Sequence, residues 1–170
     1  MTSLQSLPLF IVGNNGGLGK LYGLNNLRGT LRIKILVQLE DVNSQSEAKN
    51  LKEKKHFKKL NLAWAQQEGF DDMLLDCLQP HPNLKILKVW EYTGWHFQVG
   101  FLPFHLPPLS ELPFLETLHF YEMKGLEYIS DRDMCEELCA LSFFSSLKSL
   151  VISGSPNLKG WWRSTSTPDH

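Results

Sequence analysis

Cysteine, alanine and the β-branched aliphatic residues are scarce in this chain of 170 residues. Three cysteines are too few for a disulfide scaffold, which favours a reducing compartment and predicts a cytoplasmic protein. No apolar run approaches the roughly 20 residues that span a bilayer, and the first residues lack the basic segment of a signal peptide. The net charge of −1 gives no global electrostatic reason to expect nucleic acid. Membrane-spanning proteins and small secreted domains are therefore excluded.

Leucine is the apolar residue that the chain has in excess, with 30 copies against 12 isoleucines and valines together. Four segments share the pattern apolar-x-x-Leu-x-apolar, which is the first part of the leucine-rich repeat consensus. A weaker fifth copy lies at 29–33, where Leu27 is one place out of register. The second leucine recurs at intervals of 29, 27, 31 and 32 residues. The segments are 57–64, 84–90, 115–121 and 147–153.

This spacing has a physical reason. A strand period of two sends both members of a pair such as Leu60 and Leu62 to one face. One repeat cannot bury that face alone, so neighbouring repeats stack and share a continuous core. The sequence therefore predicts an α/β solenoid, an irregular leucine-rich repeat. Its curved parallel sheet would have four to five short strands, with return segments that mix helices and loops.

The return segments differ in kind. Ser44 and Glu47 have capping-box spacing and predict a helix over about 45–55. A second short helix is expected from Asp71 to Leu78, stopped by Pro80. Residues 102–113 carry four prolines, which favour an irregular arc. Two further expectations are a short helix over 131–141 and a disordered tail over 164–170. Of Trp161 and Trp162, we expect at least one to pack into the core.

The polar residues between the leucines should line the opposite, concave face of the sheet. Trp90 and Tyr121 would form an aromatic ladder on adjacent strands, typical of a binding surface. The alternative is that these two side chains cover a neighbouring return loop. The candidate binding residues are Lys59, Asn61, Lys88, Trp90, Thr117, His119, Tyr121, Ser149 and Ser153.

Other motifs favour structure over chemistry. The glycine-rich segment 13–20 lacks the first glycine and the hydroxyl residue of a phosphate-binding loop, which favours a flexible loop. The lysine run over 49–59 is interpreted as a solvated helix face, with contact to an acidic partner as the alternative. Cys135 and Cys139 are interpreted as small buried residues. No zinc motif or serine-nucleophile motif is present, so no enzyme, cofactor or metal is predicted.

Several segments resemble the N-terminal part of the leucine-rich repeat region in plant intracellular nucleotide-binding disease-resistance proteins of the coiled-coil class. The most distinctive is Leu78–Lys85, which combines two prolines with a histidine. The other segments with this resemblance are 1–13, 24–29, 39–42, 106–113 and 156–162. The resemblance extends over residues 1–163, and one repeat looks shortened near 95–104.

The resemblance implies a non-catalytic protein-interaction module of a plant immune receptor, acting in effector or guarded-protein recognition and in autoinhibition. Its implied partners are a pathogen effector, a guarded host protein or the receptor's own nucleotide-binding module, with no nucleic acid. No such module or coiled coil precedes Met1, which implies a receptor fragment or a diverged truncated copy. The alternatives are a stand-alone leucine-rich repeat adaptor and a non-functional truncated receptor copy.

Overall fold

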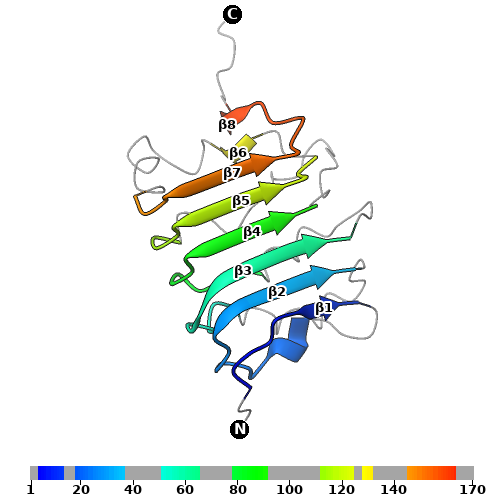
Figure 1. Ribbon diagram of the computed structural model, residues 1–170, viewed down its shortest axis with the longest axis vertical. Coiled ribbons are helices and arrows are strands. Elements are labelled where there is room, and N and C mark those ends of the chain that lie inside the picture. The colour runs from blue at the N-terminus through cyan, green and yellow to red at the C-terminus, as the bar shows by residue number, and fades with distance from the viewer. Residues whose placement is uncertain are drawn as a thin grey trace, which may run out of the picture.

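The computed structural model describes residues 4–13, 18–36, 51–65, 78–91, 112–124, 128–131 and 145–163. Six strands form one parallel sheet, and each strand lies beside the strand of the next repeat. Figure 1 shows them as an open, uncurled ladder with β1 at one end and β7 at the other. The strands are β1 (Phe10–Val12), β2 (Gly29–Ile35), β3 (Phe57–Trp64), β4 (Ile86–Trp90), β5 (Thr117–Tyr121) and β7 (Ser149–Ser153). The predicted leucine-rich solenoid is confirmed, with β1 as an additional strand.

A second, two-stranded parallel sheet joins β6 (Tyr128–Asp131) to β8 (Gly160–Arg163). Tyr128 pairs with Gly160, just as Thr117 of β5 pairs with Ser149 of β7. In each pair the two partners are 32 residues apart in the sequence. The same repeat length therefore separates the paired strands of both sheets. The described residues contain one helix, the 3-10 helix η1 (Leu18–Leu21).

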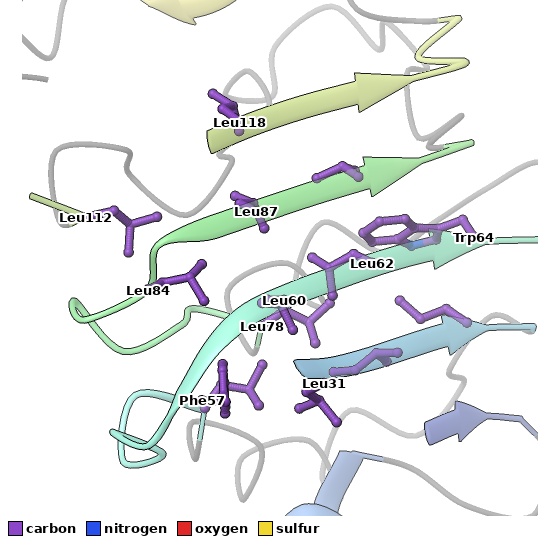
Figure 2. Packing of buried hydrophobic residues seen from close by; sticks show 14 of the residues in the cluster. Leu31, Phe57, Leu60, Leu62, Trp64, Leu78, Leu84, Leu87, Leu112 and Leu118 are labelled. Atoms are coloured by element: carbon purple, nitrogen blue, oxygen red, sulfur yellow. The ribbon is translucent and has the colours of Figure 1, made fainter. Parts of the chain in front are cut away.

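The core is built from two rows of apolar side chains that cross the sheet. Leu60 and Leu62 are 0% and 1% exposed, whereas the alternate residues of β3 point outward and reach solvent. Figure 2 shows the labelled leucines of successive strands on the same side of the sheet. Each burial contributes about 1.5–3 kcal/mol, so the rows are the main stabilising element. The first row is Leu31, Leu60, Leu87, Leu118 and Leu150; the second is Ile33, Leu62, Val89, Phe120 and Ile152.

The apolar residue at the start of each predicted segment also points into the core. Phe57, Leu84 and Leu115 are buried, as the consensus predicts. Turns with hydrogen bonds between residues three apart deliver two of them, because the amides of Leu84 and Leu115 donate to the carbonyls of His81 and Leu112. Leu27 is buried too, and the out-of-register spacing is taken up by a register shift between β2 and β3 at Gly29 and Thr30.

The expected helix over 45–55 does not continue through its last residues. The amide of Lys54 donates to the Leu51 carbonyl, and that of Lys55 to the Glu53 carbonyl, so tight turns replace helical hydrogen bonds. The chain must turn here because both Leu51 and Phe57 enter the core. Residues 37–50 lie outside the described part of the chain.

The interpretation of the lysine run over 49–59 as a solvated helix face is wrong for Lys54. Its side chain is 0% exposed, and Nζ donates to Asn25 Oδ1 of the preceding repeat at 3.1 Å. Burial lowers the pKa of this ammonium group, because a charge is disfavoured where water is excluded. Lys52, Lys55 and Lys59 are exposed, so the run is divided between a buried link and a solvated edge.

Several expectations fall outside the described residues. These are the helix over 71–78 up to its last residue, the arc over 102–111, the shortened repeat, both cysteines of 131–141 and the tail. At the borders, Leu78 and Pro80 are buried and Asp131 ends β6. The two tryptophans of β8 are placed by their backbone only.

The leucine rows predict a sharp asymmetry between the faces of β5. Leu118→Ala should lower the free energy of unfolding by about 2–5 kcal/mol, since it removes buried methyl groups and leaves a cavity. The neighbouring Thr117→Ala, on the outer side, should change it by no more than about 0.5 kcal/mol. Urea unfolding followed by circular dichroism measures both; equal losses would contradict the assignment of the faces.

A second prediction concerns Gly154, which follows β7 with a φ of 69°. A Cβ atom there would lie 3.1 Å from Glu122 Cα, and the left-handed conformation adds its own cost. Gly154→Ala should therefore destabilise the fold by about 1–2 kcal/mol. Gly160→Ala is the matched control, because nothing lies within 4 Å of its added methyl group. An indistinguishable thermal melt of the two variants would refute this account.

Candidate protein-binding surface

The outward residues of β2, β3, β4, β5 and β7 form three rows, which together we call the outer face. Parallel pairing brings each outward residue beside its counterpart in the next repeat. The rows are Thr30-Lys59-Ile86-Thr117-Ser149, then Arg32-Asn61-Lys88-His119-Val151, and finally Lys34-Ala63-Trp90-Tyr121-Ser153. All nine candidate residues from the sequence lie in these rows. Lys59 and Ser153 are exposed, and the other seven are half-buried.

Trp90 and Tyr121 are brought together as expected, because their strands pair in register at this position. The two rings stack with centroids 5.4 Å apart and planes inclined by 13°. Stacking aligns two large apolar surfaces that remain half-buried, which is the composition of a binding anchor. The alternative role, covering a return loop, concerns residues 92–111, which are outside the described part of the chain. The role of the pair in binding therefore stays a prediction.

His119 lies on β5, two residues before Tyr121, and β7 pairs with β5 at this position. Its ring meets Tyr121 edge-on with an interplanar angle of 88°, and Nδ1 lies 3.1 Å from the Tyr121 hydroxyl. Nε2 lies 3.5 Å from Ser149 Oγ. Burial, and then the positive charge of Lys88, lower the pKa of His119, so the imidazole is neutral at neutral pH.

The contact between Ser149 and His119 is a poor basis for nucleophilic catalysis. A serine nucleophile needs a histidine base that a third group orients, in the well-studied triads a carboxylate. Here a phenol occupies that position, and the lowered pKa of His119 makes its imidazole a weaker base. Within the described residues, no three histidine, cysteine or acidic side chains are grouped to hold a metal ion. The arrangement supports recognition through polar and aromatic contacts.

Three polar residues of the outer face, all on β2, were not among the candidates from the sequence. Thr30, Arg32 and Lys34 continue the rows beside β3, and the two cationic side chains are exposed. The available signal was the weaker repeat copy at 29–33, whose leucine is out of register. These residues enlarge the candidate surface by one strand and make it basic at that end.

A charged ladder runs along the residues that precede three of the strands. Glu116 accepts from Lys85 Nζ at 2.6 Å and from Lys148 Nζ at 2.8 Å. These two ammonium groups lower the pKa of the Glu116 carboxyl to about 2, Lys148 having the larger effect. The bridge joins β4, β5 and β7 at one edge, but its exposure limits its stabilising effect.

Within the described residues, no helix is long and apolar enough to cross a membrane. The repeated strand, the inward leucines and the parallel stacking define a leucine-rich repeat protein. The family model of the R13L1/DRL21 LRRs matches residues 18–155, and the chain belongs to this family.

Curated relatives agree with that membership. The chain is 31% identical to the disease resistance protein RGA4 and 30% identical to RGA2, both of Solanum bulbocastanum, over 94% of its own length. It is 27% identical to the disease resistance RPP13-like protein 1 of Arabidopsis thaliana over 89% of its length. The chain spans 18–19% of the length of these relatives. No solved structure shows a significant match.

The ladder around Glu116 predicts an unusual acid titration. In the folded protein its carboxyl should titrate near pH 2, and Lys148→Ala or Lys85→Ala should raise that pKa towards 4.5. Since the folded pKa is depressed, the stabilisation is fully present above the unfolded value of 4.5 and is lost as pH falls through about 2. Carbon-detected NMR of the glutamate carboxyls measures this; a wild-type pKa near 4.5 would contradict the two-lysine bridge.

Proposed function

We propose that this chain is a non-catalytic protein-binding module within a plant disease-resistance protein, and that its outer face contacts the partner. The observation that carries the proposal is the in-register surface of polar, cationic and stacked aromatic side chains on a leucine scaffold. Membership of the family and the names of its relatives support the biological setting. The partner is a pathogen effector, a guarded host protein or the nucleotide-binding module of the same receptor. We place the module in the cytoplasm.

The module would act through differential affinity. A partner shifts an equilibrium between inactive and active receptor states only by its preference for one of them. A solenoid suits this task because its core rows fix the outer face while the outward residues are free to vary chemically. Recognition would therefore be set by outward residues and stability by inward residues.

Photo-crosslinking tests this assignment with two matched aromatic positions. Benzoylphenylalanine replaces Tyr121 on the outer face in one variant, and in the other it replaces Phe114, which is 55% exposed in the turn before β5. Irradiation in leaf extract with and without pathogen challenge, followed by mass spectrometry, should give a defined protein adduct from position 121 only. Equal adducts from both positions, or none from position 121, would overturn the outer face as the binding surface.

A further inference from the structure

Charge is distributed unevenly over the described strands and turns. Residues 18–36 and 51–65 contain nine lysines and arginines but a single acidic residue, Glu53. Residues 78–91 and 112–124 contain three cationic and three acidic side chains. The described strands and turns are therefore basic around β2 and β3 and balanced around β4 and β5, whereas the intervening sequence, 37–50 and 66–77, contains seven acidic residues and one lysine.

The outer face concentrates this basic character around one residue. Asn61 on β3 pairs with Arg32 on one side and Lys88 on the other, and Lys59 is two residues before it on the same strand. Lys34 completes the group from the next outward position of β2. None of these four cations has an ion pair with another described residue, and the three outer-face rows contain no acidic residue.

Two histidines lie close enough to lysines of the described repeats for those charges to affect their pKa values. The pKa of His81, in the turn before β4, is lowered by burial and then by the charges of Lys58, Lys55 and His56. The pKa of His119 on the outer face is lowered by burial and then by Lys88. Nearby lysine charges therefore add to the effect of burial in lowering both pKa values.

The two halves of the outer face offer different chemistry. Arginine and asparagine side chains donate hydrogen bonds that a carboxylate can accept. Lysines without an ion pair to another described residue add electrostatic attraction at longer range. The stacked Trp90 and Tyr121 offer apolar area instead, and the two acidic residues that follow their strands, Glu91 and Glu122, balance the charge there. A ligand that satisfies both halves must be acidic at one end and apolar at the other.

We propose that the outer face binds an extended acidic segment of a partner protein, with its carboxylates around Asn61 and an apolar side chain against Trp90 and Tyr121. The proposal rests on the assignment of this chain as a protein-binding module and specifies the chemistry of the partner. The segment crosses the strands, as the rows do. Its carboxylates would pair with Arg32, Lys34, Lys59 and Lys88, which have no ion pair with another residue in the described part of the chain.

The spacing of the strands sets the length of the segment. Neighbouring strands lie roughly 4.8 Å apart, so β2 and β5 are separated by about 14 Å. An extended chain advances about 3.3 Å per residue, and about four or five residues therefore cover the distance. Three or four acidic residues next to one large apolar residue fit both halves.

A protein segment fits this surface better than single-stranded nucleic acid. Nucleic acid is held by successive bases that stack on free aromatic faces. Here Trp90 and Tyr121 cover each other's inner faces, and the basic group around Asn61 contains no aromatic ring. The experiment must therefore distinguish binding of an acidic peptide from binding of nucleic acid.

The experiment uses fluorescein-labelled synthetic peptides and fluorescence anisotropy with the full chain. The first peptide has four glutamates followed by a leucine, and the second has serine in place of the leucine. A third has glutamines in place of the glutamates, and an eight-residue thymidine oligonucleotide tests nucleic acid. The leucine peptide should bind most tightly, and its affinity should fall as sodium chloride rises, because salt screens the cations.

The diagnostic variant is Asn61→Asp, which keeps the side-chain shape and places a carboxylate among the four cations. It should weaken binding of the leucine peptide by about tenfold or more while keeping or raising the melting temperature. Ser145→Asp, in the exposed turn before β7, is the control with the same change of charge. Tyr121→Ala should weaken the leucine peptide by about five- to tenfold and leave the serine peptide unchanged.

Equal binding by the Asn61→Asp and Ser145→Asp variants would overturn the proposal, as would tighter binding of the oligonucleotide than of the leucine peptide. Failure of every peptide to bind the wild-type chain would also overturn it. The protein-binding assignment would still stand in that case if benzoylphenylalanine at position 121 gives its defined adduct. The two proposals can therefore fail separately.

Discussion

The constraint on which the structure depends is the lateral register between leucines of successive repeats. Leu60 must lie beside Leu87, and Leu87 beside Leu118, because each strand buries its inward side chains only against those of its neighbours. The intervals between these leucines vary, yet the register is unbroken from β3 to β7. The return segments absorb the variation, while the short strand motif stays constant.

This constraint separates scaffold from surface. Inward positions accept only apolar side chains of suitable volume, whereas the outer face accepts arginine, asparagine, histidine or tryptophan in adjoining repeats. The ends of the strands are shaped by the same stacking: Glu91 and Glu122 both follow their strands with a φ of 56°, and Gly154 follows β7 with a φ of 69°. Left-handed residues at the equivalent position in three repeats redirect the chain at one edge of the sheet.

Strand periodicity made part of this structure predictable from sequence. The motif identified β2 to β5 and β7, and it also predicted that Trp90 and Tyr121 would be neighbours, because register follows from alignment of the leucines. Strands β1, β6 and β8 were not predicted, because short segments such as Phe10–Val12 lack the repeat motif. Their pairing depends on the neighbouring strands of the folded chain.

Side-chain environments that depend on another repeat were not predictable. The sequence around Lys54 predicts a surface lysine. Its side chain is instead buried, where it donates to Asn25 of the preceding repeat. Arg32 and Lys34 were missed because Leu27 shifts the register of their repeat. The bridge at Glu116 joins residues more than 30 positions away on both sides, which no local pattern encodes.

The central claim is that inward residues carry the fold and outward residues are free to carry recognition. The most direct test replaces one whole outer-face row, Arg32, Asn61, Lys88, His119 and Val151, by threonine in a single variant. The account predicts a melting temperature within a few degrees of the wild type, since threonine suits an exposed strand and the leucine rows are untouched. Loss of the cooperative transition in that variant would contradict it.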